Sequence, residues 1–207
     1  MAEQRAVAKA TALLALWNDV DPALDALYNE WHANEHVPER LTVPGMLWGR
    51  RYGRADAAAI AGGLRYLTLY GLSSPQVLDE EPYRRLLREP TSTSARMRPA
   101  LQNVSRWVCI LHIEADFDRG SHLALWVSDG EPAGDSEARR GRVRYPDAAG
   151  LLVASRVPDT APLPWLQAGQ GRGIEGEWIE GLAFDLRHQP ELATLSGMTL
   201  YERLPVR

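Results

Sequence analysis

The sequence predicts an α+β protein made of two tandem ferredoxin-like (split βαβ) repeats, and three observations support this fold class. The elements expected over residues 12–114 follow the order strand, helix, strand, strand, helix, strand. The tetrapeptide L-A-L-W occurs at 14–17 and again at 123–126, and the expected strands are apolar on both faces. We therefore expect a first repeat over residues 1–115, which carries the site, and a diverged second repeat over 116–207.

Turn and capping residues bound each element of the first repeat. A strand over 12–18 stops at the turn sequence N-D-V-D-P, in which Asp21 followed by Pro22 is typical of a helix start. We expect this helix to end or kink at Val37-Pro38, because proline cannot donate a backbone hydrogen bond. The elements that follow are a strand over 46–52, a strand over 64–72, a helix after Ser74-Pro75 and a strand over 106–114.

The second repeat is expected from the same order of elements. Its L-A-L-W precedes a short acidic turn and a proline, and A-G-L-L-V-A-S-R from Ala149 resembles P-G-M-L-W-G-R-R from Pro44. A ferredoxin-like sheet leaves one face uncovered, so two such sheets would bury each other and form a pseudo-dimeric α+β barrel within one chain. The later elements are a helix near 132–140, a strand over 177–186, a short helix near Pro190 and a strand over 198–204.

Composition restricts the partners of the chain. Its 207 residues carry 23 basic and 27 acidic side chains, which give a formal net charge of −4. This balance argues against nucleic acid, and the lack of a run of about 18 apolar residues argues against a membrane span. The single cysteine, Cys109, excludes an internal disulfide and fits a reducing compartment. We expect a cytoplasmic protein whose partner is a small-molecule ligand or substrate, with a homo-oligomer left open.

The first helix carries the candidate acid–base groups. At about 100° per residue, Glu35 falls on the apolar stripe that contains Tyr28 and Trp31, and these two rings would line the same pocket. His32 and His36 lie at the edge of the stripe. Desolvation against the rings should raise the pKa of Glu35, while a neighbouring histidine titrates near neutrality. The alternative is a hydrogen-bonded structural helix end, since structural networks also place polar groups on apolar faces.

The string H-A-N-E-H at 32–36 also matches H-x-x-E-H, the inverted zinc-protease pattern. Pro38 stands just beyond it and interrupts the helix that a metalloprotease would continue. No second helix offers an obvious third ligand, and glycine-rich phosphate loops and dinucleotide fingerprints are absent from the sequence. We therefore expect neither a bound metal nor another cofactor.

Two strands and one loop supply the other candidate binding residues. By strand alternation, Trp48 and Tyr52 share one face, Arg51 lies on the opposite face, and Tyr66 belongs to the next strand. An arginine here can meet a carboxylate or enolate oxygen, although arginines at strand ends are more often solvated. The segment T-S-T-S-A-R-M-R-P at 91–99 is basic and rich enough in hydroxyls to cap an anion, and its alternative role is a solvated connection.

Residues 27–52, L-Y-N-E-W-H-A-N-E-H-V-P-E-R-L-T-V-P-G-M-L-W-G-R-R-Y, resemble the EthD-like branch of the dimeric α+β barrel superfamily. That branch carries a W-H/Y-x-x-E-H-x-P-E signature, a V-P-G turn and an R-Y pair, and R-M-R-P near Arg96 is similar too. The resemblance covers residues 11–112. The matching positions are Trp31, His32, Glu35, His36, Pro38, Glu39, Pro44, Gly45, Arg51 and Tyr52.

The resemblance implies a pocket between the sheet and the helices. Activities in the superfamily range from lactone isomerases and cofactor-free monooxygenases to polyketide cyclases, decarboxylases and haem enzymes. The second repeat lacks W-H-x-x-E-H, which indicates one site per chain. Fold analogy alone does not decide the chemistry.

We expect a small-molecule enzyme of catabolic or secondary metabolism, with cofactor-free lyase- or isomerase-type chemistry. Glu35 or a neighbouring histidine would move a proton next to a carbonyl of an apolar, oxygenated or keto substrate. One alternative is a non-catalytic module that binds a hydrophobic ligand or serves in assembly. Another is an oxygenase-type barrel, either cofactor-free or haem-dependent. A titration separates the first two, because an enzyme needs a group that titrates at about pH 6 to 8.

Overall fold

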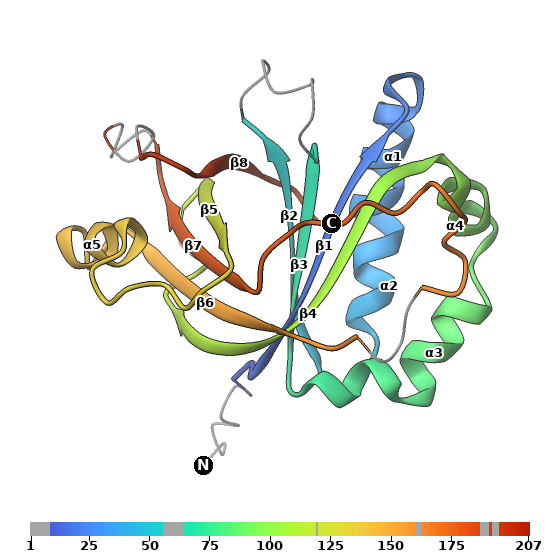
Figure 1. The fold of residues 1–207 in the computed structure, drawn as a ribbon. Coiled ribbons are helices and arrows are strands. Elements are labelled where there is room, and N and C mark those ends of the chain that lie inside the picture. The colour runs from blue at the N-terminus through green and yellow to red at the C-terminus, as the bar shows by residue number, and fades with distance from the viewer. Residues whose placement is uncertain (1–8, 56–63, 119, 160–162, 187–190, 192–194) are drawn as a thin grey trace, which may run out of the picture.

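The part of the chain that the structure describes contains eight strands, which close into a single antiparallel barrel (Figure 1). This computed structural model describes residues 9–55, 64–118, 120–159, 163–186, 191 and 195–207. Neighbouring strands follow the order β1-β3-β2-β8-β5-β7-β6-β4 around the barrel. The strands are β1 (Ala12–Val20), β2 (Met46–Arg54), β3 (Tyr66–Leu72), β4 (Leu101–Ala115), β5 (His122–Ser128), β6 (Gly150–Val157), β7 (Trp178–Phe184) and β8 (Thr199–Leu204).

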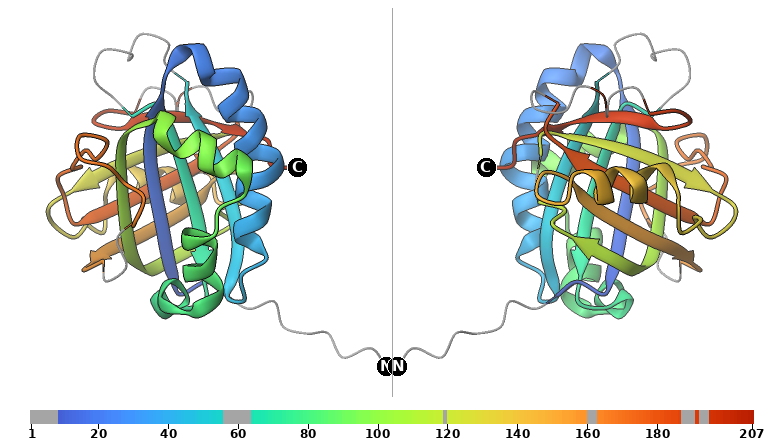
Figure 2. Two further views of the ribbon diagram at one scale, coloured as in Figure 1. Left: turned by 90° about the vertical axis from the view of Figure 1, so that its right-hand side faces the viewer. Right: turned by 90° about the vertical axis from the view of Figure 1, so that its left-hand side faces the viewer.

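The helices lie outside the barrel. Figure 2 shows α3 and α4 in front of the barrel from one side and α5 in front of it from the opposite side. A continuous helical run over residues 22–41 lies beside α4 and covers the first strands. The helices are α1 (Asp25–Trp31), a π-helix (His32–His36), α2 (Val37–Leu41), α3 (Glu81–Arg88), α4 (Ser92–Met97) and α5 (Glu137–Arg144), with 3-10 turns at Pro22–Leu24, Pro75–Asp79 and Arg98–Ala100.

The predicted fold class, two tandem ferredoxin-like repeats in a pseudo-dimeric arrangement, is wrong. The structure has one closed eight-stranded antiparallel barrel with few helices. Two separate sheets would each keep free edges, whereas β2 here pairs with β8 and β4 pairs with β6, with Arg51 opposite Leu204 and Val108 opposite Val157. The order of elements in a sequence does not say whether sheet edges hydrogen bond to each other, and closure removes those edges.

Most element boundaries agree with the sequence. Asp21 caps the first helical turn, since its Oδ1 accepts a hydrogen bond of 2.9 Å from the backbone N–H of Ala23. The 91–99 segment, expected as a loop, instead forms α4, with Thr91 Oγ1 accepting from the N–H of Ser94 at 3.1 Å. The short helix expected near Pro190 lies outside the described residues. The proposed boundary after residue 115 falls between β4 and β5.

Alternation along the strands produces two apolar layers. In β1, Leu13 and Trp17 belong to the cluster that fills the barrel, while Leu14 packs in the layer between the barrel and the helices. Cys109 also lies inside the barrel, where burial raises the pKa of its thiol to about 12. The strands are therefore apolar on both faces because the barrel interior and the helical layer are separate cores.

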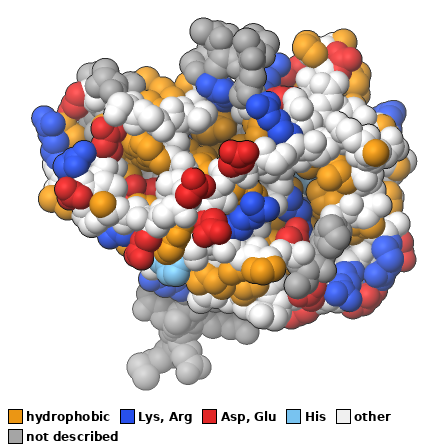
Figure 3. Space-filling view, viewed as in Figure 1, with side chains coloured by type: hydrophobic (Ala, Val, Ile, Leu, Met, Phe, Trp, Pro, Cys, Tyr) orange, Lys and Arg blue, Asp and Glu red, His pale blue; other side chains and the backbone are white. Residues whose placement is uncertain are grey.

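On the face shown in Figure 3, acidic and basic side chains are interspersed among apolar ones. Within the described residues, no helix has the length and hydropathy needed to cross a bilayer.

Candidate functional site

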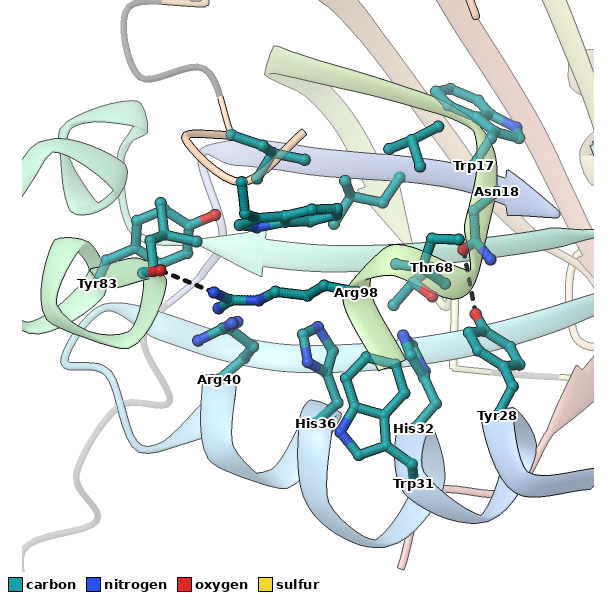
Figure 4. A pocket seen from close by; sticks show the side chains of 16 residues that line it. Trp17, Asn18, Tyr28, Trp31, His32, His36, Arg40, Thr68, Tyr83 and Arg98 are labelled. Carbon is teal, nitrogen blue, oxygen red and sulfur yellow. Dashed lines mark hydrogen bonds between the residues drawn. The ribbon is translucent and has the colours of Figure 1, made fainter. Parts of the chain in front are cut away.

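A cavity lies between the helical run over residues 22–41 and the outer face of β1 and β3 (Figure 4). Its empty space measures about 560 Å³ including the mouth, and about 50 Å³ of this admits the centres of water molecules. The polar lining is Asn18, Tyr28, His32, His36, Arg40, Thr68, Tyr83 and Arg98. The apolar lining is Leu16, Trp17, Trp31, Leu87, Leu101, Val104, Leu163 and Trp165. The site is therefore a narrow, mostly apolar recess with a few polar groups, as expected for a small-molecule pocket.

A π-turn brings the two histidines of H-A-N-E-H to this cavity. The backbone N–H of Val37 donates to the carbonyl of His32, five residues earlier, and the helix continues through Pro38. In a regular α-helix the proline ring would crowd the carbonyl of Asn34, and the wider π-turn relieves this contact. The helix therefore continues past Pro38 instead of ending there, and the irregularity expected at Val37-Pro38 takes the form of a π-turn. Such π-turns are frequent at functional sites.

The π-turn also changes which residues face the sheet. His32 is 6% exposed and Arg40 is 4% exposed, whereas the apolar Leu27 is 37% exposed. A uniform turn of 100° per residue does not describe this segment, because one turn contains an extra residue. His32, His36 and Arg40, which are spaced four residues apart, line the cavity together.

Aromatic rings pack in a continuous row along this face. Tyr66 contacts Tyr28 with ring centroids 4.6 Å apart, and Tyr28 contacts His32 at 5.0 Å. His32 stacks on His36 at 4.9 Å, and Trp31 packs against His36 at 4.6 Å. The two imidazoles are held in fixed positions by these contacts.

The surroundings of both histidines favour the neutral imidazole. Burial lowers the pKa of His32 well below its ordinary value, and the charges of Arg51 and Arg40 lower it further. Burial, followed by Arg40, His32 and two other arginines, lowers the pKa of His36 in the same direction. The expectation of a histidine that titrates near neutrality is thus not met. The Nδ1 atoms of both rings are buried and have no hydrogen-bond partner among the described residues.

Two arginines occupy one end of the cavity. Arg98 is 7% exposed, and it donates to the carbonyls of Leu87 at 2.9 Å and Leu86 at 3.0 Å. Figure 4 shows Arg98 reaching over His36 towards Arg40 and Tyr83. The positive charge of this end is fixed by hydrogen bonds to the carbonyls of α3.

Glu35 lies half-buried beside α4 and is not part of the cavity lining. Its Oε1 accepts hydrogen bonds from the hydroxyls of Thr91 and, at 3.4 Å, Ser94. The Ser94 oxygen in turn accepts a bond of 3.2 Å from the indole N–H of Trp31. Glu35 is therefore connected to the cavity through Ser94 and Trp31, which is the arrangement of a positioning residue.

The other predicted binding residues divide between two environments. Tyr66 and Arg51 lie next to the cavity, since Tyr66 packs on Tyr28 and Arg51 is 6.0 Å from the Tyr28 ring. Tyr52 belongs to the cluster inside the barrel, and Trp48 packs against that cluster. The alternation predicted for this strand is correct, but the cavity lies on the side of Arg51, so Trp48 and Tyr52 do not reach it.

Sequence reasoning missed several residues of the site. Arg40 continues the four-residue spacing of His32 and His36, and this spacing could have predicted that Arg40 lines the same cavity. Arg98 belongs to the basic segment that the sequence suggested for anion capping, whereas Arg96 of the same segment is exposed. No local pattern indicates Tyr83 or Trp165.

The described residues do not form a metal site. No group of three histidine, cysteine, aspartate or glutamate side chains is placed to hold an ion within them. His32 and His36 stack face to face, and Glu35 bonds to α4 instead of approaching the rings. The H-x-x-E-H pattern is therefore present without the geometry that a zinc site requires.

The sequence matches no known protein family and no curated protein. Among solved structures, an anthrone oxidase-like protein superposes with a TM-score of 0.59 and 14% identity, covering 96% of this chain and 93% of that chain. A chlorite dismutase-like protein gives a TM-score of 0.48 and 11% identity, covering 94% and 95%. The first likeness shows a shared overall fold with the anthrone oxidase-like protein.

Proposed function

We propose that the cavity is the active site of an enzyme that moves a proton next to a carbonyl group of a small, partly apolar substrate. Lyase or isomerase chemistry follows from such a step. The observation that carries the proposal is a pair of imidazoles, His32 buried and His36 half-buried, whose buried Nδ1 atoms have no partner among the described residues, in a cavity that also holds two guanidinium groups. A neutral imidazole can accept a proton, whereas a histidinium cannot.

His36 is the proposed general base, because it lies between Trp31, His32 and the arginine end of the cavity. Removal of a proton from the carbon next to a carbonyl forms an imidazolium and an enolate. The guanidinium groups of Arg40 and Arg98 at one end of the cavity favour an anionic substrate and the negative charge that develops on it. The proton then returns to another carbon or to a departing group.

His32 and Glu35 have supporting roles in this proposal. His32 stacks on His36 and fixes the plane of its ring. Glu35 acts through Ser94 on Trp31, which packs against the same ring. The sequence-based assignment of Glu35 as the proton-transfer group thus becomes a positioning role.

The residues present do not fit a haem. The enclosed space of the cavity, about 50 Å³, is too small for a flat macrocycle. A cofactor-free oxygenase would share the deprotonation step and would differ by consuming dioxygen. The EthD-like resemblance of residues 27–52 stays a prediction.

Deuterium exchange tests the proposal. In D2O, the wild-type protein should accelerate exchange of the protons next to the ketone of 4-oxo-4-phenylbutanoate or of its uncharged amide, followed by NMR. The His36→Gln variant should lose at least about 10²-fold of this acceleration, the usual size of a general-base contribution. A wild-type rate equal to that of buffer for both compounds, or an unchanged rate in the variant, would contradict the proposal.

A further inference from the structure

The geometry points to an anion subsite at the α2–α4 end of the cavity, where Arg40 and Arg98 bind the carboxylate of a small acid that carries one ring. This inference deepens the proposed function, because it takes the same cavity as the substrate site and names the substrate class. It does not depend on which residue moves the proton.

Arg40 supplies the hydrogen-bond donors of the subsite. It is 4% exposed, and its Nη1 is buried without a hydrogen-bond partner among the described residues. The nearest carboxylate oxygen, Glu39 Oε2, lies 3.5 Å from Nη1 and makes no hydrogen bond either. A buried guanidinium with an unmet donor is costly, and an anion that accepts from it removes much of this cost.

Arg98 supplies a second positive charge at a fixed position. Its Nη atoms are held by the carbonyls of Leu86 and Leu87, and Trp165 lies 5.5 Å from its guanidinium carbon. These bonds prevent the side chain from turning away to solvent. An anion that reaches Arg40 therefore lies within the field of both arginines.

The charge of the lining is only partly offset by the protein, through the ion pair of 3.5 Å between Arg40 and Glu39. The polar lining within the described residues contains two arginines and no aspartate or glutamate. Glu39 and Glu35 are half-buried on the same helical run but are not among the lining residues. The cavity is thus positive at one end, and a bidentate carboxylate is the group that suits a guanidinium pair.

The rest of the lining selects an apolar body for the ligand. Leu87 and Trp165 lie beside Arg98, and Trp31 lines the same cavity next to His36, so a ring attached to the carboxylate would be desolvated there. The narrow volume favours one ring over a fused system. Inorganic phosphate would meet the same charges but would leave the apolar walls without contact.

A bound carboxylate would also assist the proposed base. Arg40 and Arg98 are among the charges that lower the pKa of His36. A negative group between them offsets this effect, so an acidic substrate makes His36 more basic than an uncharged one does.

Calorimetric titration of the full-length protein tests the subsite with a matched pair of ligands. 4-Oxo-4-phenylbutanoate should bind about 10-fold or more tightly than its uncharged amide, and Arg40→Met should remove this preference. Arg96→Met, an exposed arginine on α4, is the matched control and should retain it. If Arg40→Met fails to fold, the test uses the affinities of the acid and the amide for Arg40→Lys and for the wild type.

Three results would overturn the inference. The amide could bind as tightly as the acid, the preference could survive in Arg40→Met, or inorganic phosphate could compete as strongly as the acid. The proposed function can fail separately from the subsite. If the protein exchanges the protons of the amide but binds the acid no more tightly than the amide, only the subsite is wrong. If it binds the acid tightly but exchanges the protons of neither compound, only the proton-transfer role is wrong.

Discussion

The buried histidine pair should make the protein less stable in weak acid, and the structure sets the size of this effect. The folded-state pKa values of His32 and His36 lie well below the ordinary value, so unfolding allows both rings to bind protons. A histidine whose pKa is lower in the folded state than in the unfolded state contributes stability that is fully present above its unfolded-state pKa. This stability is lost progressively as pH falls below about 6.5.

The magnitude follows from proton linkage. Each ring that stays neutral in the folded state contributes a slope of about 1.4 kcal/mol per pH unit below the unfolded pKa. Between pH 7.5 and 5.5, each ring therefore lowers the free energy of unfolding by about 1.4 kcal/mol, and the pair lowers it by up to about 2.7 kcal/mol.

Urea denaturation at pH 7.5, 6.5 and 5.5 provides the assay. Burial raises the pKa values of Glu39, Glu114 and Glu180, so these carboxyls change stability in the opposite direction. At each pH, the free energy of unfolding of the His32→Gln/His36→Gln double variant is subtracted from that of the wild type. This difference removes the contribution of the three carboxyls. His112→Gln, an exposed histidine, is the control and should keep the wild-type pH dependence. Equal acid sensitivity in the wild type and the double variant would refute the assignment of two neutral, buried rings.

Three further substitutions test other parts of the structure. Glu35→Gln weakens the hydrogen-bond acceptor that holds Ser94, so urea denaturation should show a free energy of unfolding about 1 kcal/mol lower. The rate of deuterium exchange should fall less in this variant than in His36→Gln. No loss of stability, or a loss of exchange as large as that of His36→Gln, would contradict the positioning role. Pro38→Ala removes the reason for the π-turn, so near-UV circular dichroism should change while the far-UV spectrum is retained; an unchanged near-UV spectrum would contradict this account. Gly71→Ala places a Cβ 2.1 Å from the Trp48 ring and should cost about 1 to 3 kcal/mol of stability by thermal or urea unfolding, and a neutral effect would contradict the packing of Trp48.

The strands and helix starts were predictable because their signals are local. Asp21-Pro22 marks a helix start, and apolar runs bounded by turn residues mark most of the strands. Closure of the barrel depends on pairing between β2 and β8 and between β4 and β6, which join residues at least 36 positions apart. Periodicity within a segment carries no information about such pairing, so the fold class was wrong although the order of elements was largely right.

The candidate site was predictable in part for the same reason. The helix that contains H-A-N-E-H was identified, together with Tyr28 and Trp31. Glu35 shares a side of the helix with Trp31, as predicted, but both side chains bond to α4 there, so Glu35 contacts Thr91 and Ser94 instead of lining the cavity. Arg98 and Trp165 reach the cavity from other parts of the chain, and only tertiary structure brings them there.

The central claim is that His32 and His36 are neutral rings in a cavity that receives an acidic ligand. Nitrogen NMR of histidine-labelled protein measures this directly. At pH 7 the imidazole nitrogens of both residues should show neutral rings, and 4-oxo-4-phenylbutanoate should shift them while leaving exposed His112 unchanged. Two rings that titrate at about pH 6.5, like free histidine, and do not respond to the acid would contradict the account.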